Sequence, residues 1–245
     1  MFRIPIIPSL LFLLAAVCIS PAMAQDTADS QPAELTPACP VPTVGAGAEP
    51  VLEKVRDRYK GKSFCMDFSQ YATMKGMGIT DTGTGSACFK YPDRMHWHYK
   101  EPEEQHVVSD GDSLWIYRPE DRQVMVGEAA GFFGGGEGAS FLSDPTVLVE
   151  RFSVKLGEQD LLSQWDAGEG VVLELAPRNP TREFAMLFLV IDPETGDIEQ
   201  SVSYNQFGDE TRIVFTDPDF REDIPDSEFV FVPPGTADVI RMEDR

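Results

Sequence analysis

The chain contains few of the residues that catalytic and nucleic-acid-binding sites usually need. It has 3 histidines and 4 cysteines in 245 residues, and 20 basic residues stand against 41 acidic ones, giving a formal net charge of −21. Phosphate backbones and anionic membranes attract clusters of lysine and arginine, so this balance argues against both as partners. After the N-terminal region, no stretch reaches the roughly 18 uninterrupted apolar residues of a membrane span.

Catalytic signatures are also missing from the sequence. There is no G-x-S-x-G elbow, and the glycine run Gly134–Gly138 lacks the Lys-Ser/Thr that completes a phosphate-binding loop. The carboxylates between Asp217 and Glu228 fall in a turn-rich charged stretch, which favours a solvated face over a calcium or acid/base site. The sequence therefore predicts a binding protein that has no enzymatic activity and needs no cofactor.

The N-terminus has the pattern of a secretory leader. Arg3 supplies the positive charge, Leu10–Ile19 is a short apolar core, and Ala22-Met23-Ala24 is a small-x-small cleavage signal. A lipoprotein leader ending at Cys18 is the alternative, but the preceding Val17 is too large for such a site. We expect a signal peptide over residues 1–24, a disordered Pro/Ala-rich tether over 25–48, and one domain over 49–245.

Aromatic residues are concentrated in Gly85–Arg118, in three short runs of alternating apolar and polar residues separated by turn residues. This alternation is typical of strands with one dry and one wet face. Trp97 and Tyr99 share one face, opposite His96 and His98, and Trp115 and Tyr117 oppose Leu114 and Ile116 in the same way. So much aromatic area without a catalytic signature predicts an apolar surface or cavity. The remaining pattern predicts a helix and a long antiparallel meander, over Glu49–Lys60, Ser63–Thr73, Thr82–Tyr91, Arg94–Lys100, Gln105–Ser109, Leu114–Arg118, Gln123–Val126, Ser153–Gly157, Gly170–Ala176, Glu183–Ile191, Ile198–Phe207, Thr211–Thr216 and Phe229–Val232.

A glycine-rich tract interrupts this meander at Gly127–Ser143 and carries four large apolar residues: Phe132, Phe133, Phe141 and Leu142. Asp144-Pro145 then predicts the start of a short helix that reaches about Phe152. The tract could be a surface loop that fills local core. We favour a lid, in which apolar residues on a flexible hinge close over a cavity.

The cysteines and histidines each leave two alternatives. Cys65 and Cys88 lie in consecutive strands and face each other if the hairpin is centred between Gly76 and Met77, whereas a one-residue shift puts them on opposite faces. We expect a disulfide between them. The three histidines, His96, His98 and His106, have the ligand type for zinc, but ordinary solvent-facing histidines give the same pattern, and we assign no metal site.

Several short motifs occur together in a fairly specific order and resemble the periplasmic outer-membrane lipoprotein carrier family, LolA. They are Asp67-Phe68-Ser69-Gln70, Gly85, Lys90-Tyr91-Pro92, Met95–Tyr99, Ser109-Asp110-Gly111, Leu114–Tyr117 and Phe229–Pro234. The resemblance implies a mainly β fold: an incomplete, strongly curved antiparallel β-barrel with a helical lid over an apolar cavity. It also implies a monomeric periplasmic carrier of lipoprotein acyl chains, loaded by an inner-membrane ABC-type release complex and unloaded at an outer-membrane receptor or membrane.

The resemblance further implies site residues. The acyl-chain cavity would be lined by Phe68, Phe89, Met95, Trp97, Tyr99, Trp115, Tyr117, Phe184 and Phe188. The lid would carry Phe132, Phe133, Phe141, Leu142 and Leu148. The family usually has an arginine that holds the lid where this chain has Tyr91, so Tyr91 and Arg94 are the latch candidates. Gly235 follows Pro234 directly, which also departs from the family pattern. The alternative is a lipoprotein-sensing anti-sigma-factor regulator of the same fold, but such regulators carry a second C-terminal domain, whereas this chain ends at Arg245.

Overall fold

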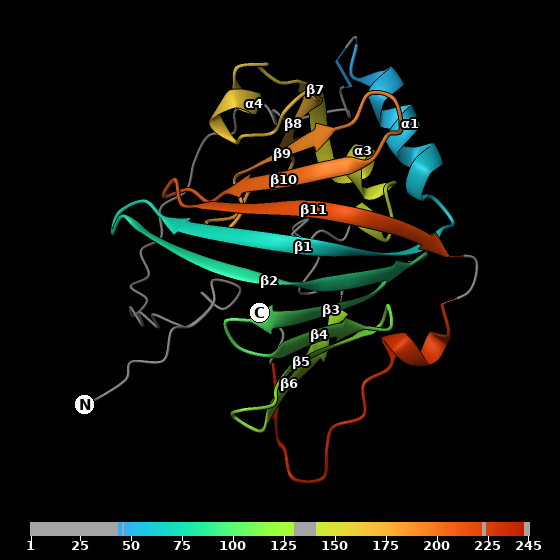
Figure 1. The fold of residues 1–245 in the computed structure, drawn as a ribbon, viewed down its shortest axis with the longest axis vertical. Helices are drawn as coiled ribbons and strands as arrows, with labels where there is room; N and C mark the ends of the chain where they lie inside the picture. The colour runs from blue at the N-terminus through green and yellow to red at the C-terminus, as the bar shows by residue number, and fades with distance from the viewer. Residues whose placement is uncertain (1–43, 46, 130–140, 222–223, 243–245) are drawn as a thin grey trace, which may run out of the picture.

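The computed structural model describes residues 44–45, 47–129, 141–221 and 224–242 (Figure 1). The predictions for the signal peptide, for nearly all of the tether, and for Phe132 and Phe133 lie outside these residues. The helical elements are α1 Glu49–Tyr59, α3 Val147–Arg151, α4 Leu161–Gln164 and the 3₁₀ helix η3 Asp226–Phe229. The strands are β1 Ser63–Met74, β2 Ile79–Lys90, β3 Arg94–Glu101, β4 Gln105–Ser109, β5 Ser113–Arg118, β6 Gln123–Glu128, β7 Phe152–Leu156, β8 Val171–Pro177, β9 Met186–Ile191, β10 Ile198–Tyr204, β11 Glu210–Arg221 and β12 Asp238–Arg241. None of the described helices is long and apolar enough to cross a membrane.

The described strands form one curved, open sheet in the order β12-β6-β5-β4-β3-β2-β1-β11-β10-β9-β8-β7 (Figure 1). The chain runs through β1 to β6 as a meander, crosses over by way of α3, and runs through β7 to β11, which returns to pair with β1. All of these pairs are antiparallel, as predicted. The last strand, β12, instead runs parallel to β6.

The two edges of the sheet are each met by another part of the chain. On the β7 edge, Val44 forms a parallel bridge with Val154, and the Gly45 N–H donates to the Val154 carbonyl at 2.8 Å. On the β6 edge, the four residue pairs between β12 and β6 begin with Asp238 opposite Gln123. The outer sides of β7 and β6 are therefore partly paired, and β12 becomes the last strand of the sheet beside β6.

The first hairpin has the register that the sequence predicts. Cys65 lies directly opposite Cys88 in the pairing of β1 with β2, and the two residues form a disulfide. The turn between the strands spans residues 75–78, so the hairpin is centred between Gly76 and Met77. Because the bridge joins two central strands of the sheet, it fixes this register covalently.

Replacing both Cys65 and Cys88 with serine is expected to lower the free energy of unfolding by about 3 kcal/mol, because the bridge restricts the unfolded chain across a sequence separation of 23. Guanidinium denaturation measures this loss. Reductant should destabilise the wild type by a similar amount and leave the double variant unchanged. An unchanged free energy of unfolding of the wild type after complete reduction would contradict the prediction.

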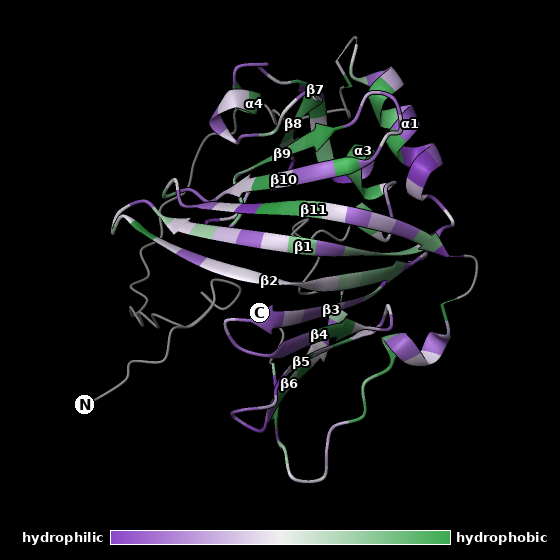
Figure 2. Ribbon diagram, viewed as in Figure 1, coloured by the Kyte–Doolittle hydropathy of each residue, from purple (hydrophilic) through white to green (hydrophobic). Residues whose placement is uncertain are grey.

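The end of the chain differs from the prediction. Phe229–Val232 was expected to be a strand, but η3 ends at Phe229 and residues 230–234 have no regular structure. The alternation is real, since Phe229 is buried and Val230 is exposed, but the segment packs across the sheet and does not pair at an edge. The ring of Phe231 lies 5.2 Å from that of Tyr117 on β5. Figure 2 shows the apolar stretch after η3 as hydrophobic. The sequence-based prediction also did not include α4 and β12.

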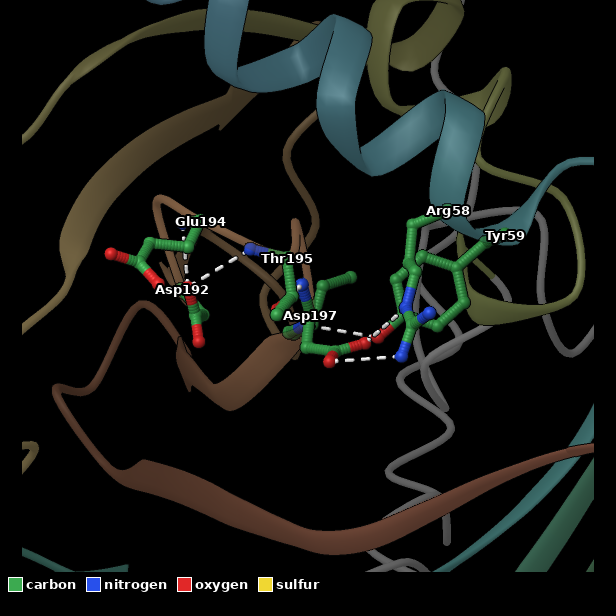
Figure 3. Close-up of polar contacts among 7 residues, drawn as sticks. Arg58, Tyr59, Asp192, Glu194, Thr195 and Asp197 are labelled. Atoms are coloured by element: carbon green, nitrogen blue, oxygen red, sulfur yellow. Dashed lines mark hydrogen bonds and ion pairs between the residues drawn. The ribbon is translucent and has the colours of Figure 1, made fainter.

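Helix α1 packs against one end of the sheet through an apolar face, because its apolar residues recur with the period of a helix. Leu52, Val55 and Tyr59 face inward and are buried, while the other side is charged (Figure 2). Arg58 forms two hydrogen bonds with the Asp197 carboxylate, at 2.6 and 3.1 Å. The Ile198 N–H donates to the Tyr59 hydroxyl at 2.9 Å. Figure 3 shows these contacts beside the turn between β9 and β10. The helix is thus held to the second half of the sheet by charge as well as by apolar packing.

Candidate apolar binding site

The inner side of the curved sheet carries an aromatic cluster from the first three strands. Phe68 on β1 meets the rings of Trp97 and Tyr99 edge-on, each at a centroid distance of 4.8 Å. Phe89 on β2 meets Trp97 in the same way at 5.5 Å. All four side chains are buried. The strand alternation predicted that Trp97 and Tyr99 share one face, and in the structure that face is the inner one.

A buried polar pair lies within this apolar wall. The Tyr99 hydroxyl donates a hydrogen bond of 2.9 Å to Oε1 of Gln70, and both residues are buried. Burial raises the pKa of the Tyr99 phenol, so it stays a neutral donor. A small hollow opens beside this pair, with Gly83 and Gln105 also in its lining. Gln70 was not predicted as a site residue, although it is the last residue of the Asp67–Gln70 motif.

The far wall comes from the second half of the sheet. Strands β8 and β9 contribute four buried leucines to the same apolar core: Leu173, Leu175, Leu187 and Leu189. Their alternation predicted the strands, but we did not assign them to the site, because nothing local says which face of a strand meets the cavity. Phe184, just before β9, belongs to this core and meets Phe152 edge-on at 6.0 Å.

The described part of the predicted lid fills the space between the walls. Phe141, Leu142 and Leu148 are buried in the same core as Trp97. The helix begins later than expected, at Val147, because the Asp144 carboxylate accepts hydrogen bonds from the N–H and hydroxyl of Thr146 and so forms a turn before the helix. The concave side is thus covered by an apolar segment that comes from the crossover.

Three of the nine predicted cavity residues lie elsewhere. Trp115 and Tyr117 are half-buried on the opposite side of the sheet, because Leu114 and Ile116 occupy the inward positions of β5. Phe188 belongs to a second, separate core, where its ring lies 5.4 Å from that of Trp165. The other six, Phe68, Phe89, Met95, Trp97, Tyr99 and Phe184, share the inner core. The nine residues therefore do not line a single surface.

The latch candidates make other contacts. Arg94 forms an ion pair of 2.7 Å with Asp226, and Lys90 approaches the same carboxylate at 2.6 Å, which ties η3 to the sheet. The Lys90 hydrogen bond and the Arg94 charge lower the pKa of Asp226. The N–H of Tyr91 donates a hydrogen bond to the Lys62 carbonyl, at 3.2 Å. Arg94 therefore holds the C-terminal segment among the described residues, and its role as a lid latch stays a prediction.

Asp93, in the turn before β3, lies near two charged residues of the crossover, Asp144 and Arg151. Partial burial and the nearby Asp144 carboxylate raise the pKa of Asp93, and Arg151 at the end of α3 opposes that shift. Both charges belong to the segment that covers the inner core. No signal in the sequence pairs these positions, because they meet only through the crossover.

Comparison with known proteins agrees with this architecture. The family model for the outer membrane lipoprotein carrier protein LolA matches residues 60–232. The outer-membrane lipoprotein carrier protein of Nitrosomonas europaea is 28% identical over 182 residues, covering 74% of this chain and 84% of the relative. That of Cupriavidus pinatubonensis is 29% identical over 185 residues, covering 74% and 82%.

A solved structure shares the fold. An uncharacterized conserved protein from Thermus thermophilus superposes with a TM-score of 0.51 at 12% identity, and the match covers 80% of this chain and 99% of that one. The family model spans most of the domain, including the aromatic strands, the crossover and the strands that return to β1. By this match, the chain belongs to the LolA family.

Proposed function

We propose that this protein is a periplasmic carrier that shelters the acyl chains of lipoproteins inside its curved sheet and moves them from the inner to the outer membrane. The single observation that carries the proposal is the buried aromatic wall of Phe68, Phe89, Trp97 and Tyr99, covered by an apolar segment from the crossover. The relatives named outer-membrane lipoprotein carrier protein support the same role.

The physical need for such a carrier is large. Burying one methylene is worth about 0.8 kcal/mol. A triacyl anchor has on the order of 40 methylenes, so its full exposure to water would cost roughly 30 kcal/mol. A carrier has to shelter much of this area and still release it. Apolar contact suits both tasks, because it is non-directional and no bond has to be broken at handover.

Phe141, Leu142 and Leu148 provide a way to admit the cargo. In the structure they occupy the inner core, next to the position that acyl chains would take. Acyl chains that displace these side chains replace one set of apolar contacts with another, so the core remains dry. Without cargo, the segment thus fills the space that acyl chains would occupy. Binding by this exchange needs no catalytic residue, metal or cofactor.

The same role implies partners. An inner-membrane ABC-type release complex would load the carrier, and an outer-membrane receptor or the membrane itself would accept the cargo. We propose that the carrier works as a monomer. The acidic surface, with a net charge of −21, suits transit between anionic membranes, because it opposes adsorption to either one.

Binding of a synthetic triacylated lipopeptide that carries a fluorophore on its peptide tests the proposal. Fluorescence anisotropy should show saturable binding to the purified protein, and the same peptide without acyl chains should not bind. Phe141→Asp is expected to weaken binding about tenfold or more, since it puts a charge among the displaced apolar contacts. Loaded protein should then release the lipopeptide to vesicles.

Phe207→Asp is the matched control, because Phe207 is 73% exposed on the turn between β10 and β11 and should leave affinity unchanged. Circular dichroism confirms that both variants are folded, and Phe141→Ala serves if the aspartate variant is not. Equal affinity for acylated and bare peptide would refute the carrier. Tight binding without release to vesicles would favour the regulator, which senses lipoproteins and does not deliver them.

A further inference from the structure

All three histidines of the chain meet on the outer side of the sheet. His98 on β3 and His106 on β4 are direct cross-strand partners, and their rings stack at a centroid distance of 4.2 Å. The turn before β4 brings Glu104 back to this pair. Its Oε1 lies 3.2 Å from Nε2 of His98 and 3.5 Å from Nε2 of His106. Two imidazoles and one carboxylate therefore converge on one point.

A chain of hydrogen bonds orients the ring of His106. Nδ1 of His96 lies 2.9 Å from the Glu228 carboxylate, and Nε2 of His96 lies 3.0 Å from Nδ1 of His106. An ionised carboxylate only accepts, so Nδ1 of His96 donates, and Nε2 of the neutral ring accepts from His106. In neutral His106, Nε2 then carries a lone pair that points toward Glu104.

This arrangement leaves two acceptors facing each other. In this tautomer, the lone pair of His106 Nε2 and the Glu104 carboxylate stand 3.5 Å apart, and the same Glu104 oxygen lies 3.2 Å from Nε2 of His98. A cation between them would satisfy both. The hydrogen bonds through His96 to Glu228 are the outer partners that metal-binding histidines typically have, since they fix the tautomer and the ring.

The distances also match a transition metal. The ligand atoms of His98, Glu104 and His106 all lie within 4.8 Å of one another. In a tetrahedral zinc site, ligands at about 2.0–2.1 Å from the metal are roughly 3.3 Å from each other. The two measured separations from Glu104, 3.2 and 3.5 Å, are close to that edge. Little movement is needed to bring three ligands to one ion.

We propose that His98, Glu104 and His106 form a zinc site on the outer side of the sheet, with water as a further ligand and with His96 and Glu228 as positioning residues. Two imidazoles and a carboxylate are a ligand set that zinc accepts with an open position. Side-chain exposures of 33%, 52% and 21% make the site reachable from solvent. Because Glu228 belongs to η3, the bound ion would also be linked to the C-terminal segment.

Isothermal titration of Zn²⁺ into chelator-treated protein that carries no histidine tag tests the site. We expect one equivalent to bind, and Co²⁺ in its place to give visible absorption typical of four- or five-coordination. His106→Gln and His98→Gln should each weaken Zn²⁺ binding about 100-fold or more, since each removes a ligand. His96→Ala should weaken it about 10-fold by freeing the His106 ring, and His96→Gln, which keeps an acceptor, should restore part of that loss.

Glu104→Gln and Glu103→Gln are the matched pair, because both remove one charge from the same turn but only Glu104 is a ligand. Glu104→Gln should weaken binding about 10-fold or more, and Glu103→Gln less than about twofold. The Co²⁺ spectrum of Glu104→Gln serves as the test if the histidine variants do not fold. Equal affinity in wild type and Glu104→Gln, or several weak equivalents that survive His106→Gln, would overturn the proposal.

Discussion

Replacing Gly85 with alanine is expected to destabilise the protein by about 3 kcal/mol or more, since the new methyl group has no space. A Cβ at this position would lie 2.1 Å from the His98 carbonyl oxygen and 2.9 Å from Cα of Tyr99. Both are backbone atoms of β3, so relief requires β2 and β3 to separate beside the irregularity between Thr84 and Gly85. Urea or guanidinium denaturation, followed by tryptophan fluorescence, measures the change.

Gly83→Ala is the control for this prediction, because it makes the same chemical change two residues away on the same strand. Its Cβ would meet the Glu101 carbonyl oxygen and the Tyr99 ring at 3.4 Å, which is ordinary contact. We expect the stability of this variant to stay within about 1 kcal/mol of the wild type. Equal losses in the two variants would mean that close strand approach at Gly85 is not the cause.

The second large effect is expected at Trp97. Replacing this residue with alanine should lower the free energy of unfolding by about 3–5 kcal/mol, because it leaves a cavity in the inner core. Trp97 is 4% exposed and meets the rings of Phe68 and Phe89 edge-on, with Phe215 at 6.3 Å. The same denaturation experiment measures the loss.

Trp115→Ala provides the comparison, since it removes the same side chain from the outer side of the sheet. Trp115 is only half-buried, so about 1–2 kcal/mol is expected. Trp115→Ala should also leave binding of the acylated lipopeptide unchanged, because its ring points away from the inner core. A larger loss at Trp115 than at Trp97 would contradict the assignment of the two faces.

Local patterns in the sequence predicted much of the fold. The alternation from Arg94 to Arg118 predicted three strands close to their observed bounds. The position of the turn at the centre of the first hairpin predicted the pairing of Cys65 with Cys88. Both depend on neighbouring residues and on the two-residue period of a strand. The prediction of an apolar surface came from the concentration of aromatic residues, and the period alone left open whether Trp97 and Tyr99 or the histidines face inward.

The same period also explains why the structure places two of the predicted site residues on the outer side of the sheet. Trp115 and Tyr117 were counted for their size, although Leu114 and Ile116 alternate with them and fill the inward positions. Only one set can face inward, and a single strand does not say which. Contacts with the neighbouring strands decide which face is inward. The inward residues of one strand can therefore be predicted only together with those of the strands that pair with it.

Contacts between distant parts of the chain could not be predicted from local patterns in the sequence. The Arg94–Asp226 ion pair joins β3 to η3, which lie far apart in the sequence and pack together only in the folded chain. Phe229–Val232 has the alternation of a strand, but it packs against the sheet, with Phe231 beside Tyr117 on β5. The histidine cluster likewise depends on the register that puts His98 opposite His106.

The coverage of the two sheet edges has a consequence for self-association. An uncovered edge strand presents rows of N–H and C=O groups that can template another copy, which is a route to polymers and aggregates. Residues 44–45 on β7 and β12 on β6 take up some of those groups. Trimming either segment, or fusing a bulky partner against it, would expose backbone groups at which edge-to-edge assembly can begin.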